Sequence, residues 1–126
     1  MKKIVIVLLL LASSVFAEVE WDDMFDAYDD AKASNKIVMV MLSREGCPGC
    51  EYMKSVVFED KQVNKLLKEG FIAVELDVQQ DFVPQDLEYF ATPTFYFLDA
   101  DEKILKRING GEQIKKFIKS LEVVKE

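Results

Sequence analysis

The chain has 126 residues, of which 50% are apolar and 31% charged, and this composition fits one globular domain. It contains no histidine, so mechanisms that need an imidazole base or ligand, such as Cys-His and Ser-His catalysis, are excluded. Its 23 acidic residues outnumber the 16 basic ones, and the resulting net charge of −7 argues against nucleic acid as a partner.

The amino-terminal residues have the pattern of a secretory signal. Lys2 and Lys3 form a positive start, residues 4–11 are an unbroken apolar run, and a small-residue cleavage site ends at Ala17. The apolar run is much shorter than the roughly 20 residues that a membrane-spanning helix needs. We therefore predict a signal peptide that is cleaved after Ala17, which leaves no stable membrane anchor.

This assignment divides the chain into a signal peptide over residues 1–17 and one domain over residues 18–126. It predicts a periplasmic or otherwise exported protein. Export would place both cysteines in an oxidising compartment, where a disulfide persists.

The first part of the domain predicts a helix followed by a buried strand. Apolar residues at helical spacing indicate an amphipathic helix that ends near Ser34 and Asn35. The stripe consists of Trp21, Met24, Phe25, Tyr28 and Ala31. Residues 37–42 are continuously apolar and rich in β-branched side chains, which predicts a central strand with helices on both sides.

The middle of the domain predicts a long helical segment and a second strand. Residues 50–58 and then Val63, Leu66 and Leu67 keep helical spacing, and Gly70 is expected to cap the end. Residues 71–78 alternate as a strand. Leu87 and Phe90 suggest a short helix behind Pro84.

The last part predicts a hairpin and a closing helix. Residues 94–98 and 104–108 flank a polar turn, and Gly110 and Gly111 end the second strand. A helical stripe then runs from Ile114 to the end of the chain. The order of the elements predicts an α/β fold, a mixed sheet between two helical layers.

A Cys-Pro-Gly-Cys turn lies between the first strand and the following helix. Pro48 suits the first helical position, so Cys47 is expected at or near the N-cap. Free backbone N–H groups and the positive end of the helix then favour the thiolate, and we expect a depressed pKa for Cys47. Cys50 is one turn further on, within reach of a disulfide. The spacing assigns Cys47 as the attacking and Cys50 as the resolving thiol.

Two other interpretations of the cysteine pair are weaker. A structural disulfide that closes so short a loop restricts the unfolded chain by only about 2 kcal/mol in the entropic model. Half of a zinc site would need further cysteine or histidine ligands, and the chain has none. A redox-active disulfide, with no dissociable cofactor and no metal, is the favoured interpretation.

On these residues the sequence resembles the thioredoxin superfamily, and more closely its exported thioredoxin-like members. The resemblance covers nearly all of residues 20–122. It depends on the strand, turn and helix around the cysteines, on the strand over residues 71–78, and on the Ala-Thr-Pro-Thr segment that contains Thr92 and Pro93. It implies a three-layer α/β/α sandwich with a central mixed sheet, and thiol-disulfide oxidoreductase activity.

The resemblance also implies a substrate-binding role for Thr92 and Pro93. Pro93 corresponds to the cis-proline of the family, which lies against the redox cysteines. The backbone of Thr92 would pair with an extended substrate peptide by β-strand addition. The implied partners are protein thiols or disulfides and a membrane or periplasmic protein that resets the pair.

Residues around the turn would adjust its chemistry. Arg44 would stabilise a thiolate, and Pro48 and Gly49 form the dipeptide between the cysteines, in reversed order relative to thioredoxins. Met41 stands where thioredoxins keep a buried aspartate that handles the proton of the resolving thiol. Glu75, on the second strand, is the candidate that would exchange this proton with Cys50.

Two alternative functions remain open at the level of sequence. One is a peptide-binding scaffold that uses the same fold with an inert disulfide. The other is a copper-handling protein, because Met39, Met41 and Met53 occur near the cysteines, although methionine more often fills a core. The direction of electron flow does not follow from the sequence, because about 30 mV of reduction potential corresponds to only 1.4 kcal/mol.

Overall fold

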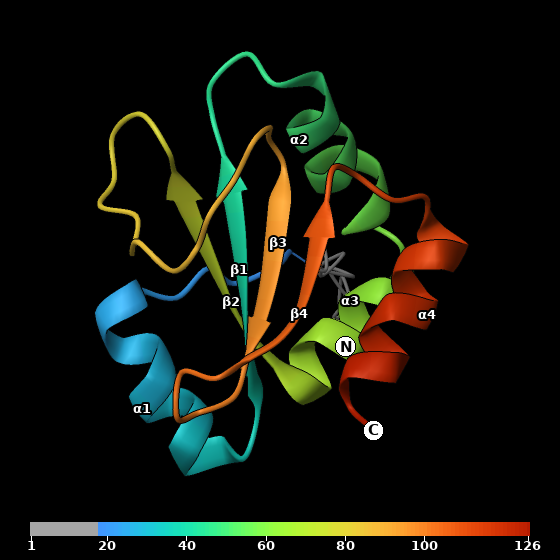
Figure 1. Ribbon diagram of the computed structural model, residues 1–126. Coiled ribbons are helices and arrows are strands. Elements are labelled where there is room, and N and C mark those ends of the chain that lie inside the picture. Colours follow the sequence, from blue (N-terminus) through green and yellow to red (C-terminus); the bar gives the residue numbers. More distant parts are fainter. Residues whose placement is uncertain (1–17) are drawn as a thin grey trace, which may run out of the picture.

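The computed structural model describes residues 18–126, and the expected signal peptide over residues 1–17 lies outside the described part (Figure 1). A single sheet of four strands runs through the centre in the order β2-β1-β3-β4. The strands are β1 (Ile37–Ser43), β2 (Phe71–Asp77), β3 (Thr94–Leu98) and β4 (Ile104–Asn109).

Strand β1 holds the sheet together because it pairs on both sides. It is parallel to β2, with Ile37 opposite Phe71, and antiparallel to β3. Strands β3 and β4 form the expected antiparallel hairpin. The continuous apolar run of β1 is buried from Val38 to Ser43, as predicted for a central strand covered on both faces.

Helices cover both faces of this sheet, which confirms the predicted three-layer α/β/α sandwich (Figure 1). Helix α1 (Met24–Ser34) packs on one face. The other face carries α2 (Pro48–Tyr52), the π-helical turn η1 (Met53–Val57), α3 (Lys61–Gly70) and α4 (Ile114–Val124). The alternation along β1 divides the core accordingly, since Met39 and Met41 face α2 to α4 while Val38 and Val40 face α1.

Helix α1 begins later than its apolar stripe predicted. Asp23 is the N-cap and accepts a hydrogen bond from the N–H of Phe25, while Trp21 precedes the helix and forms a bridge with Ala73. Phe25 is 90% exposed, and the buried positions are Ala27 and Ala31. The prediction failed because small alanines let the helix lie close to the sheet, which turns the larger Phe25 outward.

The long helical segment expected after the cysteines is interrupted between η1 and α3. Asp60 accepts hydrogen bonds from the N–H groups of Gln62 and Val63, and this N-cap starts α3 anew. Helix α3 does end at Gly70, but the following residue is extended and Gly70 is not left-handed. The predicted glycine cap is therefore wrong in mechanism.

The short helix expected around Leu87 and Phe90 is absent from the described chain. The N–H of Leu87 donates to the carbonyl of Pro84, which closes one turn, and the segment continues as an irregular loop to β3. Leu87 is buried against the α1 face, whereas Phe90 is 87% exposed. One buried side chain does not give a helix an apolar face, so the segment stays a loop.

Charge is distributed unevenly along the chain. Helices α3 and α4 together carry six lysines and two glutamates, whereas residues 77–102 carry seven acidic residues and no basic one.

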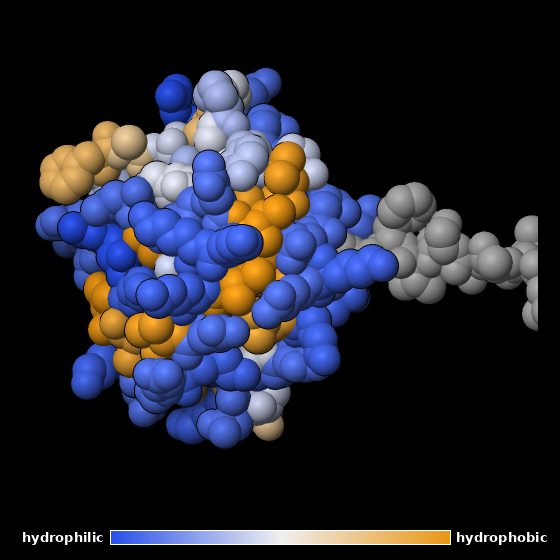
Figure 2. Space-filling model, turned by 90° about the vertical axis from the view of Figure 1, so that its right-hand side faces the viewer, coloured by the Kyte–Doolittle hydropathy of each residue, from blue (hydrophilic) through white to orange (hydrophobic). Residues whose placement is uncertain are grey.

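Figure 2 shows the side that bears α4, where an apolar band crosses a mostly hydrophilic surface. No helix within residues 18–126 has the length and apolar character needed to cross a bilayer.

Candidate redox site

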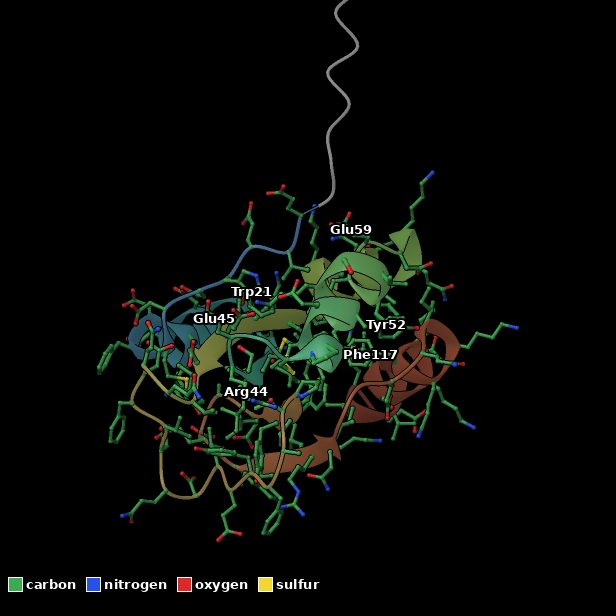
Figure 3. All side chains as sticks on the ribbon, turned by 90° about the horizontal axis from the view of Figure 1, so that it is seen from above. Trp21, Arg44, Glu45, Tyr52, Glu59 and Phe117 are labelled. Carbon is green, nitrogen blue, oxygen red and sulfur yellow. A yellow bond between two sulfur atoms is a disulfide. The ribbon has the colours of Figure 1, made fainter. Side chains whose placement is uncertain are left out.

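The two cysteines form a disulfide at the beginning of α2. Cys47 and Cys50 have Cα atoms 5.3 Å apart, and their exposed fractions are 2% and 1%. The turn follows β1 directly through the exposed residues Arg44, Glu45 and Gly46 (Figure 3). The end of a central strand thereby holds the disulfide at the rim of the sheet.

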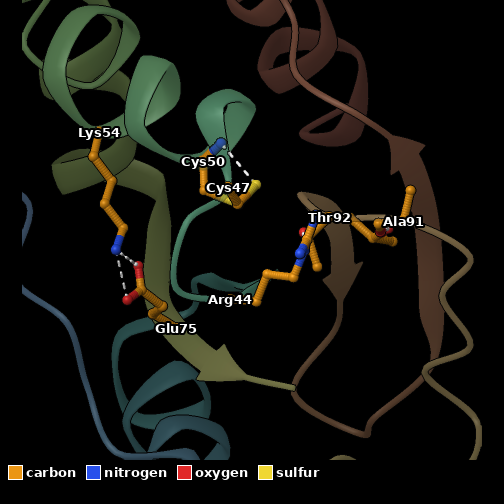
Figure 4. Close-up of a disulfide and its surroundings, with 8 residues drawn as sticks. Arg44, Cys47, Cys50, Lys54, Glu75, Ala91 and Thr92 are labelled. Atoms are coloured by element: carbon orange, nitrogen blue, oxygen red, sulfur yellow. Dashed lines mark hydrogen bonds and ion pairs between the residues drawn. A yellow bond between two sulfur atoms is a disulfide. The ribbon is translucent and has the colours of Figure 1, made fainter. Parts of the chain in front are cut away.

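Cys47 occupies the N-cap of α2, as its sequence predicted. Its backbone is extended, Pro48 takes the first helical turn, and the N–H of Cys50 points at the Cys47 Sγ, 3.2 Å away (Figure 4). In the reduced protein the same N–H and the helix end would stabilise negative charge on this sulfur. Cys50 lies inside the helix, so its sulfur is not at the N-cap. The local geometry therefore favours Cys47 as the attacking thiol.

The loop before β3 lies directly against the cysteine turn. The Thr92-Pro93 peptide bond is cis, as the resemblance implied, and Pro93 is buried. A Cβ atom at Gly49 would stand 3.0 Å from Pro93 Cδ. A Cβ atom at this distance is tighter than ordinary packing, so glycine lets the turn approach Pro93 without displacing the proline ring.

A second glycine of the site was not identified from the sequence. A Cβ atom at Gly111 would stand 3.8 Å from the carbonyl oxygen of Gly49 and 3.5 Å from Met53 Sδ. In the sequence, Gly110 and Gly111 indicated only the end of a strand. The approach of Gly111 to Gly49 joins residues 62 positions apart, for which no local pattern exists.

Arg44 connects the cysteine loop to the cis-proline loop. Its Nε donates a hydrogen bond of 3.0 Å to Thr92 Oγ1 (Figure 4). The backbone N–H and C=O of Thr92 have no hydrogen-bond partner among the described residues. The side chain of Thr92 is thus fixed while its backbone is available to another chain.

Lys54 and Glu75 form an ion pair on the side of the sheet that carries α2. Lys54 Nζ, on η1, lies 2.8 Å from Glu75 Oε1 and 2.6 Å from Oε2, and within residues 18–126 this carboxylate has no other side-chain partner (Figure 4). Glu75 is 26% and Lys54 36% exposed. Glu51, one helical turn before Lys54, is the nearer acidic residue along the chain, but the carboxylate on strand β2 pairs with the lysine instead.

The methionines near the cysteines belong to the core. Met39, Met41 and Met53 are fully buried and pack with the aromatic side chains of the α2 to α4 face. Met41 is the register partner of Glu75 on the neighbouring strand. Within residues 18–126 no group of three or more histidine, cysteine or acidic side chains is arranged to hold a metal ion. The burial of the methionines favours packing over copper binding.

Comparisons with known proteins agree with this geometry. A family model described as thioredoxin-like domain matches residues 24–125. A thioredoxin H-type of Brassica oleracea is 27% identical over 94 residues, which are 75% of this chain and 72% of that protein.

Two solved structures share the fold. A thioredoxin from Thermus thermophilus superposes with a TM-score of 0.72 and 29% identity, over 85% of this chain and 87% of that one. The reduced carboxyl-terminal domain of DsbD from Neisseria meningitidis gives a TM-score of 0.61 and 16% identity, over 76% and 88% of the two chains. At the latter identity the likeness shows a common fold alone.

Proposed function

Because this chain belongs to the thioredoxin-like domain family, we propose that its Cys47-Cys50 pair exchanges disulfides with protein substrates. The chain is a thiol-disulfide oxidoreductase of thioredoxin type. The observation that carries the assignment of the pair is the placement of Cys47 Sγ at a helix N-cap, 3.2 Å from the Cys50 nitrogen and beside the cis Thr92-Pro93 bond. A disulfide without a redox role would not require both a helix N-cap and an adjacent cis-proline.

The reaction of the reduced protein has two exchange steps. The Cys47 thiolate attacks one sulfur of a substrate disulfide, forming a mixed disulfide and releasing the other substrate sulfur as a thiolate. The Cys50 thiolate then attacks Cys47 Sγ, which closes the intramolecular disulfide and releases the second substrate sulfur. Two electrons pass to the substrate, which takes up two protons as its thiols form. In the oxidising direction the same steps run backwards.

The backbone of Thr92 supports a way of holding the substrate. Its free N–H and C=O can each pair with an extended peptide laid beside the cis-proline loop. Arg44 fixes the Thr92 side chain through its hydrogen bond. Main-chain pairing supplies affinity with little dependence on the sequence of the substrate, which suits an enzyme that acts on several proteins.

The resolving step requires that Cys50 lose its proton. Met41 offers no acceptor, but the register partner of Met41 is Glu75, whose Oε2 is buried and held by Lys54. We assign Glu75 as the acceptor for the Cys50 proton, with Lys54 as the residue that positions its carboxylate. The protein needs no dissociable cofactor for these steps, because the disulfide itself carries the electrons.

The proposed site of action is outside the cytoplasmic membrane. The charged start, apolar run and cleavage pattern of residues 1–17 support export. A membrane or periplasmic redox protein is the partner that we propose resets the pair. Export also accounts for a disulfide as the resting state of the cysteines.

The function is tested by trapping the mixed disulfide. Reduced Cys50→Ser protein is mixed with a model peptide that contains one intramolecular disulfide, and adducts are measured by mass spectrometry with and without dithiothreitol. We expect a dithiothreitol-sensitive one-to-one adduct for Cys50→Ser and none for the matched variant Cys47→Ser. Equal adduct formation by both variants, or by neither, would contradict the proposed roles and favour a peptide-binding scaffold.

A further inference from the structure

A groove lies on the opposite side of the sheet from α2. It has a volume of about 480 Å³ and is formed by the start of α1, by β2 and by the loop that follows β2. Strand β2 is an edge strand, and in Figure 1 α1 and this loop flank it on the left of the molecule. None of its lining residues belongs to the cysteine turn or the cis-proline loop.

Two exposed phenylalanines border the groove. Phe25 is 90% and Phe82 is 82% exposed, while Val74 and Leu76 form a buried apolar floor. Single exposed apolar residues are ordinary on protein surfaces, but two large aromatic side chains on one hollow are typical of an interaction surface. Phe25 is not needed for the packing of its helix, since α1 buries alanines instead.

The walls of the groove are acidic. Four of its lining residues, Asp22, Asp23, Asp81 and Glu102, contribute carboxylates, and none is lysine or arginine. Within residues 18–126 none of these four has a cationic partner, whereas the carboxylate of Glu75 is paired with Lys54 on the other side of the sheet. The pKa of Tyr28, which also lines the groove, is raised to about 12 by burial and by the charges of Glu102, Asp86 and Asp99. The groove therefore favours positive charge.

The backbone of β2 is open at the same place. The carbonyl of Ala73 accepts from the N–H of Asp22, and the N–H of Asp77 donates to Asp81 Oδ2. Alternate residues of a strand direct their backbone groups to the same side, so Glu75 also faces outward. Its outward N–H and C=O have no partner among the described residues. An extended segment could pair with them.

We propose that this groove docks an extended basic segment of a partner protein, separately from the redox turn. An apolar side chain of the segment packs between Phe25 and Phe82, its backbone pairs with Glu75, and its lysine or arginine side chains lie against the acidic walls. Charge complementarity selects this occupant, because an acidic segment or an anionic lipid surface would be repelled. The proposal does not depend on the redox chemistry.

The test uses a labelled peptide and a protein without thiols. Fluorescence anisotropy measures the binding of a fluorescein-labelled peptide of alternating lysine and valine or leucine to the Cys47→Ser/Cys50→Ser protein. A control peptide carries glutamate in place of every lysine. We expect saturable binding of the lysine peptide and at least about tenfold weaker binding of the glutamate peptide.

Matched variants locate the binding. Phe82→Ser is expected to weaken binding of the lysine peptide by about tenfold or more, since buried aromatic anchors dominate such surfaces. Phe90→Ser, which removes an equally exposed phenylalanine outside the groove, is expected to leave it unchanged. Circular dichroism confirms that both variants fold.

Several results would overturn the proposal. These are no saturable binding, an equal effect of both phenylalanine variants, or sedimentation showing that a second copy of the chain occupies the groove and is released by Phe82→Ser. Because the peptide contains no cysteine and the protein no thiol, failure here leaves the trapping experiment with Cys50→Ser unaffected. Conversely, failure of the trapping experiment would leave this binding result standing.

Discussion

At the scale of single residues, the site depends on what stands beside each sulfur. The Cys47 Sγ is opposite a backbone N–H, and Gly49 has no side chain that would separate the turn from Pro93. The N-cap position of Cys47 is local, and the four-residue turn and its preceding strand already predict it. The approach of Gly49 to Pro93 is not local, and only the family resemblance implied it. The pairing of Lys54 with Glu75 is not local either, because it joins residues 21 positions apart, whereas helical spacing alone would favour the nearer Glu51.

Tyr28 gives a prediction about pH at this scale. Its pKa is raised to about 12 in the folded protein, above the ordinary value of 10.0, because it is partly buried and faces Glu102, Asp86 and Asp99. The folded state thus disfavours the ionised phenol. Its contribution to stability is fully present below pH 10 and is lost as the pH rises from 10 through 12.

The check is the free energy of unfolding in urea for wild-type protein and Tyr28→Phe at several pH values. We expect the difference between them to be constant below pH 10, and the wild type to lose stability faster above it. Parallel curves for the two proteins up to pH 12 would show that Tyr28 titrates normally.

At the scale of elements, Asp60 decides where one helix stops and another begins. Its carboxylate caps the N–H groups of Gln62 and Val63, both at 3.0 Å. Asp60→Ala is expected to lower the free energy of unfolding by about 1 kcal/mol, the usual cost of losing such a cap. Asp60→Asn keeps an accepting oxygen and should lose much less, as measured by urea unfolding. Equal losses in the two variants would assign the effect to charge rather than to capping.

The elements also show how far the sequence could predict the fold. All four strands, α1 and α4 were predicted, because their apolar residues repeat with a period set by the backbone. The errors occurred where packing decides, as at Phe25, which is exposed although it continues an apolar stripe, and at Phe90, which has no helix to belong to. Gly111 and the partner of Lys54 depend on contacts between distant segments, which periodicity does not contain.

At the scale of the whole molecule, Phe58 joins parts of the chain that are far apart. Its ring lies 5.8 Å from Trp21, 6.2 Å from Phe95 and 5.9 Å from Phe117, between ring centroids. It therefore connects the segment before α1, strand β3 and helix α4. Phe58 itself directly follows η1, which continues the helix that begins at the cysteines. Removal of this ring should affect the entire domain and not a single element.

Phe58→Ala is expected to lower the free energy of unfolding by about 3–5 kcal/mol, because it leaves a cavity among these rings. Phe58→Leu fills part of the cavity and should lose clearly less. Denaturant unfolding followed by the fluorescence of Trp21, the single tryptophan of the chain, measures both. A loss of less than about 1 kcal/mol in the alanine variant would show that the core closes around the missing ring.

Lysines gather on α3 and α4, whereas acidic residues gather over residues 77–102. This separation of charge makes the molecule an electric dipole. In the field of a charged protein a dipole experiences a torque, so rotation toward one preferred orientation begins before the two surfaces touch. Added salt shortens the range of this field to about 8 Å at physiological ionic strength. Encounter rates should for that reason vary with ionic strength even where the final complex buries no ion pair.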